Sequence, residues 1–220
     1  LYIMDEEYVR SVCRAFRQTI AQTYGEGNMA YASKAFSCKA IYNIMKQEGT
    51  CIDVVSGGEI YTAASAGFDM SRAFFHGNNK LDGELDLAMQ AGVGTIVVDA
   101  ADDAERINEY AKKFGRVQKV LVRVNPGVEA HTHSYIQTAK VDSKFGFSIK
   151  SGAAEKAIKD VASRSNLKFS GVHFHIGSQI FDRSAFALAL DAIPDFVMQL
   201  PEDGITCDVL NLRGGFVLHY

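Results

Sequence analysis

The sequence predicts an α/β protein of parallel β/α units, and specifically a (β/α)8 barrel of the TIM type. Stretches with strand-like and helix-like patterns alternate along nearly all of the 220 residues. The connections between them are short, as expected of parallel β/α units. The sequence has no glycine-rich dinucleotide fingerprint, which favours a barrel over an open dinucleotide-binding sheet.

The expected elements follow one another in order. A short strand over residues 1–4 precedes an amphipathic helix, whose apolar residues recur at helical spacing: Val9, Val12, Phe16 and Ile20. Strands are expected at about 29–34, 52–56, 73–76, 95–99, 119–125, 168–176 and 207–212. Helices are expected at about 37–48, 58–66, 82–91, 102–114, 152–164 and 184–199.

Seven barrel strands are expected, and the sequence ends shortly after the seventh, at Gly214-Gly215-Phe216. We therefore expect residues 1–220 to form one barrel domain that is truncated after about seven strands. The first residue is Leu1 rather than Met, which is expected of a fragment or a processed form.

The composition is that of an ordinary globular enzyme, with 47% hydrophobic and 22% charged residues. A net charge of −3 gives no indication of binding to nucleic acid or to a membrane. Four cysteines lie far apart without metal-type spacing, and we interpret them as reduced thiols of a cytoplasmic protein: Cys13, Cys38, Cys51 and Cys207.

One lysine interrupts a small apolar strand in the run Tyr31-Ala32-Ser33-Lys34-Ala35-Phe36. Strand alternation places Ala30, Ala32 and Lys34 on one face. Because this face is small, it leaves room for a ligand. A lysine amine in a water-poor pocket loses its proton easily and attacks carbonyl groups.

Other charged residues are expected to face the same interior. Alternation turns Asp53, Arg123, His173 and His175 inward, while the neighbouring valines face outward. We expect these four side chains to converge with Lys34. Since burying so many charges without a role is costly, their convergence predicts a functional site.

Two glycine-containing segments predict where a phosphate binds. Gly214-Gly215 follows the seventh strand, and Gly177-Ser178 follows the sixth. Backbone amides approach a phosphate closely where no Cβ intervenes. A lysine amine, an imidazole and a glycine-rich phosphate loop together suggest pyridoxal phosphate, with Lys34 holding its aldehyde as a Schiff base and a histidine covering the ring. No metal site is expected.

Across nearly all 220 residues, the sequence also resembles the diaminopimelate decarboxylase family of fold-type III pyridoxal phosphate enzymes, which share the alanine racemase barrel. The matching segments are 31–36, Asp53-Val54-Val55-Ser56-Gly57-Gly58-Glu59, Phe75-His76-Gly77-Asn78-Asn79-Lys80, Arg123-Val124-Asn125-Pro126-Gly127, His131-Thr132-His133, Asp142-Ser143-Lys144-Phe145-Gly146-Phe147 and 173–181.

The resemblance implies a role for each matching residue. Lys34 matches the lysine that binds the cofactor aldehyde, and His175 matches the imidazole that stacks on its ring. Ser178, Gly214 and Gly215 match phosphate-binding positions. The remaining matches are polar positions around the cofactor or substrate: Asp53, Glu59, Arg123, Lys144 and His173. A carboxylate at a helix N-terminus is an equally good interpretation of Glu59.

The resemblance further implies decarboxylation of meso-diaminopimelate to L-lysine by a homodimer. The family has a further β/α unit and a C-terminal β-domain, which this sequence lacks, so we expect the chain alone to be inactive or very weak. Three glycines usually follow the seventh strand, whereas this chain has Arg213-Gly214-Gly215, and Val217 and Ala139 replace two other usual glycines. Arg213 is either strained, if its position needs φ > 0, or adds charge toward the phosphate.

Three alternatives stay open. Another fold-type III decarboxylase would act on arginine, ornithine or carboxynorspermidine. A metal-dependent barrel hydrolase would use the paired imidazoles of His131-Thr132-His133 and His173-Phe174-His175. A remnant that binds pyridoxal phosphate without catalysis would account for Arg213 and Val217.

Overall fold

The structure is a computed structural model, and it describes residues 3–127, 145–175, 183–200 and 204–213. The chain forms two compact units, Leu1–Thr95 and Ile96–Tyr220. We call them the first and second units and describe each by itself. In the part of the chain that is described, no helix combines the length and apolar character needed to cross a membrane.

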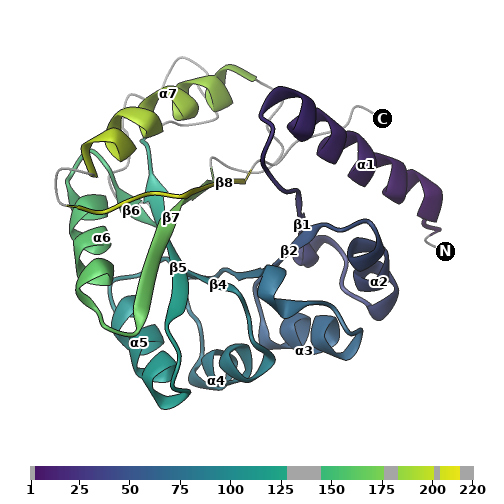
Figure 1. The fold of residues 1–220 in the computed structure, drawn as a ribbon, viewed down its shortest axis with the longest axis horizontal. Coiled ribbons are helices and arrows are strands. Elements are labelled where there is room, and N and C mark those ends of the chain that lie inside the picture. Colours follow the sequence, from purple (N-terminus) through teal and green to yellow (C-terminus); the bar gives the residue numbers. More distant parts are fainter. Residues whose placement is uncertain (1–2, 128–144, 176–182, 201–203, 214–220) are drawn as a thin grey trace, which may run out of the picture. The chain divides into compact units, whose positions relative to one another are not determined.

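The first unit contains three short parallel strands and four α-helices (Figure 1). Strand β2 pairs with β1 on one side and with β3 on the other. The strands are β1 (Ala30–Ala32), β2 (Cys51–Val54) and β3 (Ala73–Phe75). The helices are α1 (Glu6–Thr23), α2 (Lys39–Gln47), α3 (Gly57–Ser65) and α4 (Asp82–Ala91), with 3-10 turns η1 (Ser33–Ala35) and η2 (Met70–Arg72).

Apolar side chains from both faces of β2 are buried, as expected of a parallel strand covered on two sides. All four of its residues are buried. Helices α2, α3 and α4 contribute the side chains that fill this core, among them Tyr42, Met45, Ile60 and Leu85.

The second unit contains the longest of the parallel strands together with shorter ones (Figure 1). Strand β7 lies between β5 and β8, and the two-residue strand β6 pairs with β5. The strands are β4 (Thr95–Val98, which begins in the first unit), β5 (Gln118–Asn125), β6 (Phe147–Ser148), β7 (Leu167–His175) and β8 (Val209–Arg213). The helices are α5 (Asp103–Lys113), α6 (Ala153–Ser163) and α7 (Arg183–Gln199).

A bulge fixes the alignment of β7. The pairing with β5 shifts after Val120, so that Phe169 pairs with Val120 and Gly171 with Leu121. Gly171 has φ +151°, and a Cβ on it would lie 1.9 Å from the carbonyl oxygen of Val209 in β8. Only glycine fits at this close approach.

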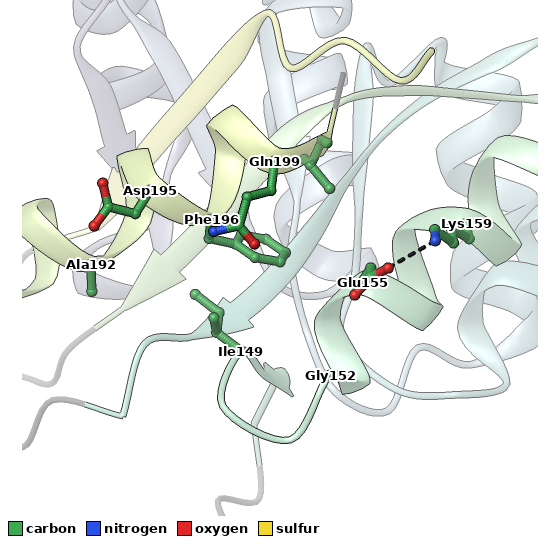
Figure 2. A pocket seen from close by; sticks show the side chains of 9 residues that line it. Ile149, Gly152, Glu155, Lys159, Ala192, Asp195, Phe196 and Gln199 are labelled. Carbon is green, nitrogen blue, oxygen red and sulfur yellow. Dashed lines mark ion pairs between the residues drawn. The ribbon is translucent and has the colours of Figure 1, made fainter. Parts of the chain in front are cut away.

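A cavity of about 640 Å³ lies between α6 and α7 (Figure 2). The side chains of Ile149 and Phe196 lie toward one another across it, and Glu155 forms an ion pair with Lys159 at 2.8 Å. None of the predicted site residues that the structure describes lines this cavity.

The predicted order of strands and helices is confirmed, with two corrections. The strand expected at 29–34 ends at Ala32, where a 3-10 turn begins. The strand expected over residues 1–4 is wrong for its described part, because Ile3 and Met4 are irregular and exposed. Strand β6 was not predicted, since two residues carry too little pattern to stand out.

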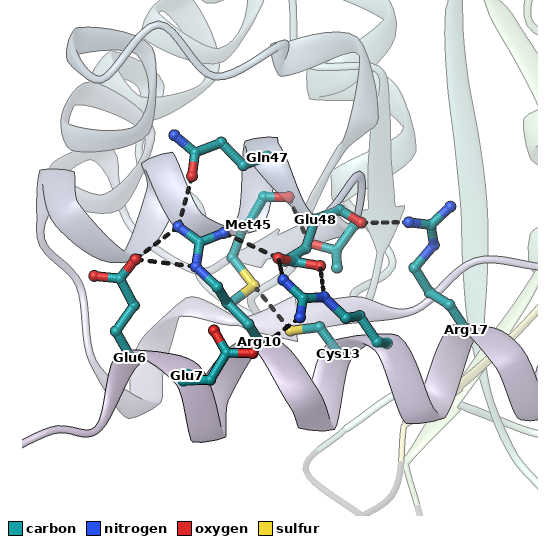
Figure 3. A network of polar contacts seen from close by, with 10 residues as sticks. Glu6, Glu7, Arg10, Cys13, Arg17, Met45, Gln47 and Glu48 are labelled. Atoms are coloured by element: carbon teal, nitrogen blue, oxygen red, sulfur yellow. Dashed lines mark hydrogen bonds and ion pairs between the residues drawn. The ribbon is translucent and has the colours of Figure 1, made fainter.

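Helix α1 is joined to α2 by a cluster of charges around Glu48, the C-cap residue of α2 (Figure 3). The Glu48 carboxylate accepts hydrogen bonds from Arg10 at 2.9 Å and from Arg14 at 2.9 and 3.0 Å. These two guanidinium groups hold the pKa of Glu48 below its usual range. Nearby, the thiol of Cys13 lies 3.9 Å from the Met45 sulfur.

Arginine at position 213 is compatible with the backbone there. Arg213 is the last residue of β8 and pairs with His175 of β7. An extended strand has negative φ, which any residue adopts without strain. The interpretation that Arg213 is forced into a left-handed conformation is therefore wrong.

We expect Glu48→Gln to lower Tm by about 3–6 °C at about pH 7, because the two arginines lose a charged acceptor. A lowered folded-state pKa adds stability above the unfolded pKa of about 4.3, and this stability is lost as pH falls through the folded pKa. The Tm difference between wild type and variant should therefore shrink toward about pH 3. Thermal melts at both pH values measure it.

The matched control for Glu48→Gln is Glu7→Gln. Glu7 pairs with Arg14 at 3.0 Å, but both side chains are exposed. We expect it to change Tm by about 1 °C or less. A constant Tm difference across the pH range would contradict the assigned role of Glu48.

We expect Arg213→Gly to lower Tm by about 1–4 °C, because glycine in a strand loses more conformational freedom on folding. Arg213→Ala, which keeps a Cβ, should lose less. Thermal melts of the two variants measure the difference. A higher Tm for the glycine variant than for the alanine variant would contradict an extended backbone at position 213 and indicate a left-handed one.

Candidate active site

Lys34 lies in η1, directly after the carboxyl end of β1. The side chain is exposed, whereas Ser33 beside it is fully buried. Because the strand ends at Ala32, the alternation expected to place Lys34 in a water-poor pocket does not reach it. The Tyr31 hydroxyl donates to the Phe36 carbonyl at 2.8 Å, which ties together the two ends of the turn around Lys34.

Asp53 lies in β2 beside Ala32 of β1, two residues before Lys34. It is buried, and its Oδ1 lies 3.0 Å from Nε2 of the equally buried His76. His76 follows β3, and its backbone N–H donates to Val54. The sequence interpretation included His76 in a strand but gave it no role. Its position at a strand's carboxyl end was the available signal.

Glu59 has a structural role at the start of α3. Its Oε2 accepts a hydrogen bond from the Val55 backbone N–H at 2.7 Å. The Ser56 side chain in turn accepts from the Glu59 backbone N–H at 3.3 Å. This reciprocal arrangement resembles a capping box, so the helix-terminal interpretation accounts for the contacts of Glu59.

A row of polar side chains crosses the three long strands of the second unit. In register, Arg123 of β5 pairs with His173 of β7, which pairs with Asn211 of β8. His173 is fully buried, and its Nδ1 lies 2.8 Å from the Asn211 Oδ1. Arg123 and His173 thus lie side by side as the alternation predicted. Asn211 was missed, because it is recognised only once β8 is aligned with β7.

The second histidine is held by a main-chain group. His175 Nδ1 lies 3.0 Å from the carbonyl oxygen of Arg213. A carbonyl can only accept, so Nδ1 carries the proton and donates it. This bond fixes the ring orientation and leaves Nε2 as the acceptor nitrogen of the neutral ring.

Arg123 forms an ion pair with a residue that the sequence interpretation missed. Its Nη1 lies 2.5 Å from Oδ2 of Asp99, which directly follows β4. The other carboxylate oxygen accepts the Gly146 backbone N–H at 2.8 Å. The Arg123 guanidinium also lies over the Phe145 ring, 4.7 Å from its centroid. The position of Asp99 at the end of the strand expected over 95–99 was the available signal.

Several predicted site residues lie outside the described residues: Lys144, Ser178, Gly214 and Gly215, together with His131, His133, Ala139 and Val217. Lys34 and Asp53 belong to the first unit, while Arg123, His173 and His175 belong to the second. Their convergence on one interior stays a prediction. Among the described residues, no group of three histidine, cysteine or acidic side chains is placed to hold a metal ion.

Each unit by itself supplies groups whose chemistry suits pyridoxal phosphate. An exposed amine follows one strand, and a fixed imidazole ends another. A guanidinium with its own carboxylate partner accompanies the imidazole in the second unit. These groups supply an aldehyde-reactive nitrogen, a flat ring for stacking and positive charge for an anionic cofactor.

Comparison with known proteins agrees with this chemistry. Residues 9–220 match the model of the family described as pyridoxal-dependent decarboxylase, pyridoxal binding domain. The chain is 42% identical to the diaminopimelate decarboxylase of Halalkalibacterium halodurans and 43% identical to that of Bacillus subtilis, over its whole length in both cases. It spans about half the length of these relatives, 50% of each.

Solved structures give the same result. The crystal structure of diaminopimelate decarboxylase from M. jannaschii matches with a TM-score of 0.86 and 36% identity, covering 99% of this chain and 51% of that one. The Helicobacter pylori enzyme complexed with L-lysine matches with a TM-score of 0.76 and 29% identity, over 91% and 49% of the two chains. The predicted fold class is thereby confirmed. From residue 9 to residue 220, this chain belongs to the pyridoxal-dependent decarboxylase family and corresponds to its pyridoxal-binding domain.

Proposed function

We propose that the protein containing this chain decarboxylates meso-2,6-diaminopimelate to L-lysine with the aid of pyridoxal phosphate, as a step of lysine biosynthesis. The observation that carries the proposal is the match of the entire chain to diaminopimelate decarboxylases at 42–43% identity. Structures of such enzymes from M. jannaschii and H. pylori were solved in complex with L-lysine, which is the product expected here.

Each described site residue has a proposed task. The Lys34 amine would hold the cofactor aldehyde. His175 covers the cofactor ring, in the orientation set by its bond to the Arg213 carbonyl. Asp53 and Arg123 supply charge around the cofactor, and each has a buried partner that keeps it in place. When bound, pyridoxal phosphate supplies an electron sink for the electron pair left by the departing carboxylate.

We assign phosphate binding to Ser178, Gly214 and Gly215, and a polar position near the substrate to Lys144. His173 lies beside Arg123 in the same row of the second unit. We propose that it occupies a polar position near the cofactor or substrate. We also propose that the complete protein is a homodimer in the cytoplasm.

Family membership removes one alternative and leaves two. The chain belongs to a pyridoxal-dependent family, so a metal-dependent barrel hydrolase is no longer a candidate. Lysine/ornithine decarboxylase of Vibrio vulnificus, at 22% identity, shares the fold alone. A substrate panel containing diaminopimelate, arginine, ornithine and carboxynorspermidine, tested on the complete protein, separates a diaminopimelate enzyme from its relatives and from an inactive remnant.

We expect pyridoxal phosphate followed by borohydride to leave a pyridoxyl adduct on Lys34, because a lysine bound to the cofactor aldehyde becomes permanently modified on reduction. Peptide mapping by mass spectrometry locates the adduct. Lys34→Ala should abolish it. The matched control is Lys39→Ala, which removes a neighbouring exposed lysine at the start of α2 and should leave the Lys34 adduct intact.

An absent adduct on wild-type protein would contradict the proposal. Arg213→Gly and Val217→Gly then test whether the departures from the usual glycines are the cause. Recovery of the adduct in either variant would assign the defect to that position, and no recovery would mean that the chain does not hold the cofactor.

A further inference from the structure

Asp99 uses both oxygens of a deeply buried carboxylate. Its side chain is 1% exposed. One oxygen contacts the Arg123 guanidinium at 2.5 Å, and the other accepts the Gly146 backbone N–H at 2.8 Å. The backbone of Asp99 is fixed as well, since its N–H donates to the Asp103 carboxylate at 2.9 Å. Asp99 therefore joins β5 to the turn before β6 from a rigid position.

Arg123 is confined on a second side by that turn. The Phe145 ring lies against the guanidinium, 4.7 Å from centroid to Cζ, at a distance typical of a cation–π contact. Gly146 has φ +71°, and a Cβ on it would lie 2.8 Å from the Arg123 carbonyl oxygen and 2.9 Å from its Cγ. The turn reaches Arg123 this closely because residue 146 has no side chain.

The position of Arg123 makes its orientation important. It lies in register with His173, toward the carboxyl end of β5, where barrel enzymes place their active sites. A guanidinium is a flat group with N–H donors in fixed directions. Once one Nη is bound by Asp99 and one face of the guanidinium plane is covered by Phe145, the directions of its other N–H groups are set.

A buried ion pair is a weak source of stability, because desolvation offsets much of the attraction between the charges. A role in orientation explains better why Asp99 and Arg123 are paired here. We propose that Asp99 is a positioning residue of the active site, which holds Arg123 in the single orientation that the bound cofactor requires. This inference rests on the proposed function, because it assigns the task of Arg123 to cofactor binding.

The test uses the complete protein and a double-mutant cycle of Asp99→Asn and Arg123→Lys. The measured quantities are the Kd for pyridoxal phosphate, kcat and KM for diaminopimelate, and Tm without cofactor. We expect Asp99→Asn to weaken cofactor affinity or kcat by about 10- to 100-fold, because a misdirected group costs that much in a preorganised site. The double variant should lose no more cofactor affinity or kcat than the more impaired of the two single variants, since both changes remove the same interaction.

Asp160→Asn is the matched control. Asp160 forms a two-point pair with Arg164 at 3.0 Å on α6, also in the second unit, but its side chain is 42% exposed. We expect the Kd for pyridoxal phosphate of this variant to stay within about twofold of wild type. A comparable loss of cofactor affinity in the control would overturn the assignment to Asp99.

Two results would overturn the inference directly. One is an Asp99→Asn protein with a lower Tm but wild-type Kd and kcat, which would make the pair purely structural. The other is a double variant whose fold-loss in cofactor affinity or kcat equals the product of the two single losses, which would mean that the two residues act independently. If Asp99→Asn does not fold, Asp99→Glu keeps the charge but displaces the carboxylate, and the same loss of affinity is expected from it. Wild-type affinity in Asp99→Glu would also overturn the inference.

Failure of the proposed function gives a different pattern. If wild-type protein neither binds pyridoxal phosphate on Lys34 nor turns over diaminopimelate, the proposed function fails, whatever the variants do. If wild-type protein binds and reacts while Asp99→Asn matches it, only the role of Asp99 is wrong.

Discussion

The arrangement of polar groups in the second unit depends on the close approach of β7 and β8 at Gly171. There the backbone of one strand touches the other, and any Cβ would overlap the Val209 carbonyl oxygen. This contact and the bulge beside it set the alignment of β7. A shift of one residue would turn every side chain beyond it to the opposite face. His173 would then lose Asn211, and His175 would lose the Arg213 carbonyl.

In both units, a buried aspartate is paired with a basic side chain. Asp53 is paired with His76 in the first unit, and Asp99 is paired with Arg123 in the second. In each pair, one partner directly follows the carboxyl end of a strand, His76 after β3 and Asp99 after β4. The other partner lies within the neighbouring strand, β2 or β5. An unpaired carboxylate would be costly to bury, while a paired one is available as a fixed charge. The pairing is thus what makes charged strand ends compatible with a packed interior.

The sequence predicted those parts of the molecule that depend on local pattern. The order of strands and helices followed from periodicity, and the common face of His173 and His175 followed from alternation, because β7 continues through both residues. Alternation failed for Lys34, since β1 ends two residues before it. The contacts made by His76, Asp99 and Asn211 could not be predicted, because each contact joins residues more than twenty positions apart and depends on strand alignment. Glu59 was ambiguous in the sequence, and its contact with the Val55 N–H shows its place at a helix start.

The main-chain bond to His175 has a consequence for how this protein can change over generations. Every amino acid carries the carbonyl group that accepts the proton of Nδ1. The side chain at position 213 is therefore not needed to orient the imidazole. Any residue that tolerates an extended backbone can occupy this position without loss of the bond. Replacement of Arg213 by an uncharged residue would alter the local charge while the His175 ring kept its orientation.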